Sequence, residues 1–196
     1  AAGLSITLGL ILALALAWIN SPRFYRLADA ASLSFASIPV FITALALTVS
    51  FGRGRAVPIM YDGTWWSAIL PVVALSLGPT FWVVRIISTD LRRILKQNFI
   101  LFRRGLGLSK SALILTALQN VSVLTTLGVN LLLALLMGTF FVEYAFNWPG
   151  IGQLLVYSLL RRDVSVVQGV VICFAFIIML TDTFVETWRQ VRENTL

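Results

Sequence analysis

The ionisable side chains of this sequence are mostly cations, and their types and spacing offer little for catalysis. The chain has 196 residues, with 15 Lys and Arg against 8 Asp and Glu. It has no histidine, so the commonest metal ligand and the usual general base are both absent. It also has no GxxxxGK[ST] segment to cradle nucleotide phosphates. These residues favour binding or transport over catalysis by this chain.

The cations gather in residues 90–120, which read DLRRILKQNFILFRRGLGLSKSALILTALQN. This segment has one acid, Asp90, and six of the chain's 15 cations: Arg92, Arg93, Lys96, Arg103, Arg104 and Lys110. A long basic segment between apolar runs is a cytoplasmic loop by the charge-bias rule. Because it reads as helical and is punctuated by glycines, we expect a structured surface on which a soluble partner docks.

The composition is that of a membrane protein. The chain is 59% hydrophobic and 12% charged, with a mean hydropathy of +0.92. Soluble domains have roughly 45–50% apolar and about 25% charged residues. The net charge of +7 would suggest nucleic acid in a soluble protein. Here the cations lie beside apolar runs, so they set topology, and no nucleic-acid partner is expected.

Five apolar runs of about 20 residues are each long enough to cross a bilayer. They cover residues 1–19, 32–51, 69–89, 121–141 and 166–187, and we expect a short loop at residues 20–31. Pro39 and Pro79 predict bends in the second and third spans, and the bend at Pro39 is either a packing kink or a gate hinge. In the fourth span, Thr125 and Asn130 are expected to face the bundle interior or a pore, or to make an interhelical hydrogen bond.

The distribution of Lys and Arg predicts the orientation. Segments 20–31 and 90–120 and the tail after residue 187 hold ten of them, whereas segments 52–68 and 142–165 hold four. The ten belong in the cytoplasm, which places the C-terminus inside and Ala1 outside. Because residues 1–19 lack a signal-peptide pattern, an earlier span is expected before them.

Residues 142–165 form a second region between spans. Trp148-Pro149-Gly150 predicts a turn at the membrane interface. A short interfacial helix is expected from Gln153 to Leu160. We expect Asp163 to form an ion pair with Arg161 or Arg162, worth about 0–1 kcal/mol at a surface.

Three patches of the chain resemble the permease subunit of binding-protein-dependent ABC importers of the oligopeptide, dipeptide and nickel group. The first is SIPVF from Ser37 to Phe41. The second is R-x-x-G-L-S from Arg104 to Ser109, followed by Leu118 and Asn120. The third, and most specific, is EYAFNWPGIG from Glu143 to Gly152, followed by RDVSVVQG from Arg162 to Gly169. The resemblance covers nearly all 196 residues.

The sequence departs from the family at the coupling signature E-A-A-x-x-x-G. If Gly107 is its glycine, Leu101, Phe102 and Arg103 stand where the family has Glu-Ala-Ala. Gly107 remains, and a glycine can supply the left-handed turn that ends one short helix and starts the next. We therefore expect the shape of the loop to be kept and its packing to differ.

The resemblance implies an all-α membrane protein, a polytopic transmembrane helical bundle with the type I ABC importer permease fold. This chain would hold five spans, with the first of the family's six missing. Residues 1–196 would be a single permease domain, with a cytoplasmic coupling loop at 90–120 and an extracytoplasmic turn and short helix at 142–165. Its expected place is the cytoplasmic membrane of a bacterium or archaeon, multi-pass, with a cytoplasmic C-terminus.

The implied function is that of a non-catalytic translocation subunit. It would pair with a second permease and two cytoplasmic ATP-binding subunits, and it would receive cargo from an extracytoplasmic substrate-binding protein. ATP and Mg would bind to the partner ATPases, and this chain would hold no cofactor and no metal. Peptides are the expected cargo, with nickel or a metal chelate as the alternative. A secondary transporter is the rival class, but such proteins commonly place ionisable residues deep in the bilayer.

The resemblance also assigns roles to residues. The ATPase-coupling loop would use Leu101, Phe102, Arg103, Arg104, Gly105, Gly107, Leu108 and Ser109. The turn facing the binding protein would use Glu143, Trp148, Pro149, Gly150, Gly152, Arg162 and Asp163. Pro39 and Pro79 would bend spans, and no residue is assigned a catalytic role.

Overall fold

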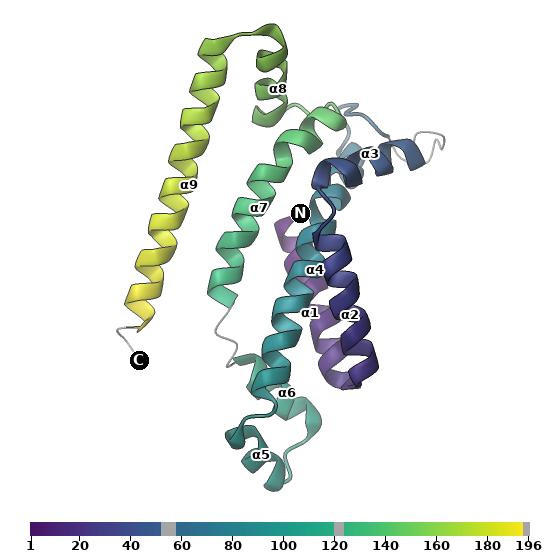
Figure 1. Cartoon of the computed structure of the whole chain (residues 1–196), viewed down its shortest axis with the longest axis vertical. Helices are drawn as coiled ribbons and strands as arrows, with labels where there is room; N and C mark the ends of the chain where they lie inside the picture. The colour runs from purple at the N-terminus through teal and green to yellow at the C-terminus, as the bar shows by residue number, and fades with distance from the viewer. Residues whose placement is uncertain (52–57, 120–123, 194–196) are drawn as a thin grey trace. The chain divides into compact units, whose positions relative to one another are not determined.

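The computed structural model describes residues 1–51, 58–119 and 124–193 (Figure 1). In the last two long helices it gives the backbone but not the side chains of residues 124–130, 132–133, 185, 188–189 and 191–193. The regular elements in these ranges are all helical, as expected. They are α1 (Ala2–Ile19), α2 (Pro22–Ala36), α3 (Val40–Phe51), the 3-10 helix η1 (Trp65–Ala68), α4 (Ile69–Ile94), α5 (Asn98–Gly105), α6 (Lys110–Gln119), α7 (Leu124–Ala145), α8 (Ile151–Arg161) and α9 (Val164–Glu193).

Three helical segments in the described ranges are long and apolar enough to cross a bilayer. They are Ala2–Ile19, Trp65–Ile94 and Val164–Phe184, and α2 with α3 adds a fourth if the pair is one broken span. The side chains of Thr125 and Asn130, and the whole of Asn120, lie outside the described residues. The span at 121–141 and the total of five therefore stay predictions.

The chain forms two compact units. One contains residues 38–76 and 128–196 together with Ala1, and the other contains residues 2–37 and 77–127. The core of the first unit is built from α3, α4 and α7 and consists of Ala44, Leu70, Ala74, Val142 and Phe146. In the second unit the buried apolar residues include Ala17, Val83, Ile87, Leu91 and Ile100.

Helix α1 packs through a stripe of small residues. Ser5, Gly9, Ala13 and Ala17 recur every four residues, and all four are buried. A Cβ added at Gly9 would lie 2.5 Å from Cγ1 of Val83, a residue of α4. Small residues at this spacing let two helices approach closely, which is how helices associate within a bilayer.

The short loop expected at residues 20–31 is wrong, because α2 begins at Pro22 and runs to Ala36. Proline is well suited to a first helical position, since its missing N–H would have no partner there and its φ is already helical. The helix therefore starts about ten residues before the expected second span.

The two prolines assigned to bends lie in different settings. The helix before Pro39 ends at Ala36 and the next begins at Val40. The hydroxyl of Ser37 donates to the carbonyl of Leu33 (2.6 Å), which satisfies an acceptor at the helix end. Pro79 lies inside α4, which is continuous from Ile69 to Ile94. A gating role for Pro39 stays a prediction.

Candidate functional site

The described part of the basic segment consists of the end of α4 and two short helices, α5 and α6, joined by a glycine turn. Gly107 has φ +84°, in the left-handed region that an L side chain rarely adopts. The N–H of Gly107 donates to the carbonyl of Arg104 (3.0 Å), and the N–H of Leu106 donates to that of Phe102 (3.1 Å). The turn thereby satisfies the last carbonyls of α5 and redirects the chain into α6.

Helix α5 is tied to α6 by one side of its surface. Nη1 of Arg103 donates to the hydroxyl oxygen of Thr116 (3.2 Å), and Ile100 is fully buried. The hydroxyl of Ser109 accepts from the N–H of Ala112 (3.4 Å) at the start of α6. The length of the Arg103 side chain bridges the two helices.

Beside Arg103, the surface of α5 carries exposed apolar side chains. Phe102 is 70% exposed and Leu106 is 64% exposed, and Phe99 is also exposed. Positions 99, 102 and 106 share one face because residues three and four apart are helix neighbours. We call Phe99, Phe102 and Leu106 the apolar face of α5. An apolar face beside so many cations is typical of a protein interaction site.

Helix α6 is linked directly to α1. The ammonium group of Lys110 donates a hydrogen bond to the backbone carbonyl of Trp18 and lies 5.3 Å from the centroid of its ring. A cation over an indole face is attracted by the ring quadrupole. Leu113 and Ala117 of α6 are buried. The loop segment is thus fixed to the end of a bilayer-length helix.

Glu143, at the end of α7, anchors the start of α8. Its Oε2 accepts hydrogen bonds from the N–H groups of Gly152 (2.7 Å) and Gln153 (3.2 Å). The first N–H groups of a helix lack partners within the helix, and a carboxylate there also interacts favourably with the helix dipole. The capping position of α8 is Gly150, which has no side chain, so Glu143 supplies the acceptor instead.

The glycines of the W-P-G-I-G turn let α8 approach α7. A Cβ added at Gly152 would lie 2.5 Å from Cα of Phe140, and one added at Gly150 would overlap the carboxylate of Glu143. Gly152 is therefore required by packing against backbone, whereas a Cβ at Gly150 would displace the Glu143 carboxylate, and Glu143, Gly150 and Gly152 come together as one structural cluster. Exposure of the cluster to a binding protein stays a prediction.

Trp148 is fixed by a neighbouring loop. Its ring packs edge-on against Tyr61, with 4.8 Å between the centroids, and the N–H of Tyr61 donates to the carbonyl of Phe146 (3.0 Å). Hydrogen bonds from the hydroxyl (2.6 Å) and the N–H (2.9 Å) of Thr64 lower the pKa of the Asp62 carboxyl and order this loop. The turn that contains Trp148 and Pro149 is therefore held in place by its contacts with the loop that contains Tyr61.

Arg162 and Asp163 join α8 to α9. Arg162 closes α8 in the left-handed conformation, with φ +58°. Oδ1 of Asp163 accepts from the N–H of Val166 (3.2 Å), in the manner of a helix cap. The expected ion pair between Asp163 and Arg161 or Arg162 is not found among these described residues, where the Asp163 carboxylate instead accepts from the N–H of Val166 in the first turn of α9.

These features define a polytopic helical membrane protein with a structured basic segment and an anchored turn between helices. Within the described ranges, no group of His, Cys, Asp and Glu side chains could hold a metal ion. Residues 5–193 match the family described as binding-protein-dependent transport system inner membrane component, and the chain belongs to that family.

Curated relatives agree with this assignment. The chain is 32% identical over 186 residues to the dipeptide transport system permease protein DppB of Bacillus subtilis (strain 168), covering 90% of this chain and 59% of that protein. It is 28% identical over 190 residues to the nickel import system permease protein NikB of Staphylococcus aureus (strain bovine RF122 / ET3-1), covering 93% and 56%. It is 28% identical over 195 residues to a putative peptide transport system permease protein of Brucella abortus (strain 2308), covering 93% and 62%.

The resemblance to permeases of the oligopeptide, dipeptide and nickel group is confirmed by these matches. The chain spans less than two thirds of the length of each of these relatives.

Proposed function

We propose that this chain is the translocation subunit of an ABC importer that moves peptides across the bacterial cytoplasmic membrane. It would hydrolyse no ATP itself. ATP and Mg would bind to two cytoplasmic partner subunits, a second permease would complete the pathway, and an extracytoplasmic binding protein would deliver the cargo. Membership in a family of binding-protein-dependent transport components supports this proposal.

The apolar face of α5 is the observation that carries the proposal. Its central residue, Phe102, is 70% exposed in a segment rich in cations. Burying such a side chain in a partner would contribute about 1.5–3 kcal/mol to binding. An ATP-binding subunit that moved on nucleotide binding would then pull α5 with it.

The contacts of α5 with α6, and of α6 with α1, would transmit this movement to the membrane. The Arg103–Thr116 hydrogen bond and the turn at Gly107 hold α5 and α6 together. Lys110 links α6 to Trp18 at the end of α1. Movement of α5 would therefore be passed to a bilayer-length helix as a rigid-body displacement.

The tied turn between α7 and α9 is the proposed receiving surface for the binding protein. Glu143 and the two glycines hold α8 against α7, and Arg162 and Asp163 fix the turn into α9. A receptor surface needs this rigidity, because ordering a slack loop on binding would reduce the affinity. The proposal also includes five spans in this chain, the family's first span before them, and a cytoplasmic C-terminus.

The proposed cargo follows from the relatives. Their names include dipeptide, peptide and nickel systems. We favour peptides, since the chain has no histidine to ligate nickel directly. A nickel or metal-chelate importer is the second candidate, because a chelated metal would need no such ligand.

Affinity purification of the full-length protein tests the proposal. The wild type is expected to bring down two nucleotide-binding chains and a second permease. Phe102→Ala should lower the retention of the nucleotide-binding chains about tenfold or more, as expected for the loss of one buried phenyl group. Phe184→Ala is the matched control, because Phe184 is also 70% exposed but lies on α9.

The control should retain the partners at the wild-type level. If the wild type brings down no nucleotide-binding chain, the protein is a secondary transporter or a structural subunit. Equal loss of the nucleotide-binding chains from Phe102→Ala and Phe184→Ala would show that α5 is not their specific binding surface.

A further inference from the structure

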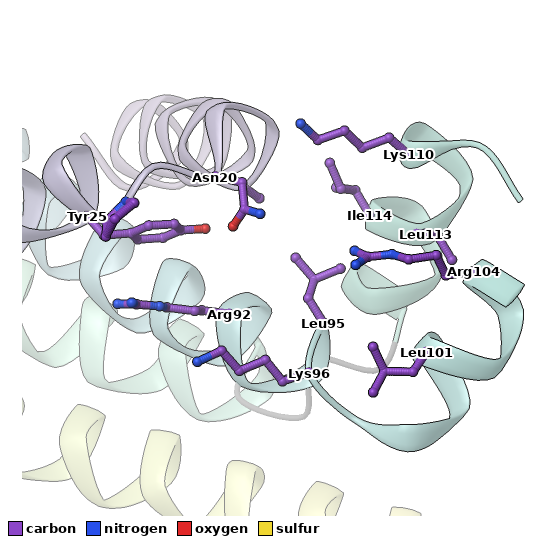
Figure 2. Close-up of a pocket in the computed structure, with 12 residues that line it drawn as sticks. Asn20, Tyr25, Arg92, Leu95, Lys96, Leu101, Arg104, Lys110, Leu113 and Ile114 are labelled. Atoms are coloured by element: carbon purple, nitrogen blue, oxygen red, sulfur yellow. The ribbon is translucent and has the colours of Figure 1, made fainter.

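A pocket of about 300 Å³ lies within the second unit, where α1, α2, α4, α5 and α6 meet (Figure 2). Four of the side chains that line it are cations, Arg92, Lys96, Arg104 and Lys110, and none of its lining residues is an acid. The pocket thus concentrates positive charge that its own lining does not neutralise.

Two of the four cations, Arg92 and Lys110, are held in place by aromatic residues and a carbonyl. The guanidinium of Arg92 lies 4.8 Å from the centroid of the Tyr25 ring. Lys110 is held by the carbonyl and ring of Trp18. Cation–π contacts fix the position of a charge but leave it positive. Arg92 and Lys110 are therefore held in fixed positions and can still bind an anion.

Tyr25 gives an independent indication of a ligand. The residue is only 3% exposed, and its phenol oxygen has no hydrogen-bond partner. A buried hydroxyl without a partner is unfavourable and uncommon. In Figure 2 this oxygen points into the pocket, and the guanidinium of Arg104 points toward it from the other side. An O–H donor and a guanidinium converging on one space are suited to a polyoxygen anion.

We propose that this pocket binds the phosphate group of a small anion, either an anionic phospholipid headgroup or free phosphate. A phosphate presents several acceptor oxygens, and the forked guanidinium of arginine matches them in pairs. Ammonium groups such as those of Lys96 and Lys110 neutralise the remaining charge. A lipid headgroup is one candidate because Ala17 lies near the end of the bilayer-length helix α1 and Asn20 directly follows it, and basic residues at the ends of spans attract anionic headgroups.

A phosphate bound at this site would hold α5 in place. Leu101 and Arg104 of α5 line the pocket together with Tyr25 of α2 and Arg92 of α4. A phosphate bound among them would join α5 to the helices that lead into the membrane. This inference does not depend on the identity of the transported cargo.

The test measures binding to the purified full-length protein in neutral detergent. Three probes are added separately: phosphatidylglycerol, zwitterionic phosphatidylcholine and inorganic phosphate. Bound lipid is counted by native mass spectrometry, and phosphate is measured by equilibrium dialysis. The variants are Tyr25→Phe, which removes only the hydroxyl, and Arg104→Gln. The control is Arg93→Gln, which removes the same charge from α4 outside the pocket.

We expect selective binding of phosphatidylglycerol over phosphatidylcholine. Tyr25→Phe and Arg104→Gln should each weaken it about tenfold or more, whereas Arg93→Gln should leave it unchanged. The same pattern with inorganic phosphate would support the site and assign it to free phosphate. Binding of neither probe, or equal weakening by Arg93→Gln, would overturn the proposal. Thermal unfolding is also measured for Tyr25→Phe, and a cooperative transition near that of the wild type is expected for a folded variant.

Discussion

Replacing Gly152 with alanine is expected to destabilise the protein by about 1–3 kcal/mol, the usual cost of overpacking a tight contact. The added Cβ would lie 2.5 Å from Cα of Phe140 and 3.0 Å from its backbone nitrogen. Backbone atoms cannot move aside as a flexible side chain can, so α8 would have to move away from α7. The hydrogen bond from the N–H of Gly152 to Glu143 would be lost with it.

Gly169→Ala is the matched control for this prediction. Gly169 lies within α9, and a Cβ added there meets no atom within 4 Å. Alanine is favoured over glycine in a helix by about 1 kcal/mol, so this variant should be as stable as the wild type or more stable. The measurement is thermal unfolding of both purified variants. A Gly152→Ala protein that unfolds no earlier than Gly169→Ala would refute the close packing of α8 on α7.

Replacing Gly107 with valine is expected to uncouple ATP hydrolysis from uptake. Gly107 has φ +84°, where an L side chain costs roughly 1–2 kcal/mol, and a β-branched residue is especially unfavourable there. Since nothing lies within 4 Å of the added Cβ, the effect would come from backbone strain and not from a clash. The turn would open, and α5 would lose its fixed position against α6.

Gly107→Asn separates backbone conformation from side-chain size. Asparagine adopts left-handed conformations more readily than other L residues, so this variant should keep most of the uptake. Substrate uptake and ATP hydrolysis are measured together in vesicles that contain the whole importer. Normal, coupled transport by Gly107→Val would exclude the turn as a part of the transmission.

The elements that could be predicted from the sequence are those specified by local rules. The length of the apolar run in α1 fixes a helix that can cross the bilayer. Gly107 and the residues around Pro149 specify turns through backbone preferences. Ser21-Pro22 was an available helix-start signal, yet the charged residues after it led to the incorrect prediction of a loop.

The contacts that complete the site could not be predicted, because they join residues far apart or across a turn. Lys110 reaches Trp18 across 92 positions, and no sequence pattern encodes that pairing. Glu143 was readable as part of a motif, but its role as the cap of α8 depends on how α8 folds back on α7. Tyr25 and Asn20 were missed entirely, since each matters only where the helices of the second unit converge.

The proposal depends above all on the apolar face of α5 lying on the cytoplasmic side, where the ATP-binding subunits bind it. The most direct measurement is labelling of Phe102→Cys with a membrane-impermeant maleimide, in a Cys173→Ser background that removes the one cysteine of the 196 residues, with the parent Cys173→Ser protein as the labelling blank. The account predicts labelling in inside-out vesicles, none in intact cells, and protection when the ATP-binding subunits are assembled. Labelling in intact cells, or labelling unchanged by those subunits, would contradict it.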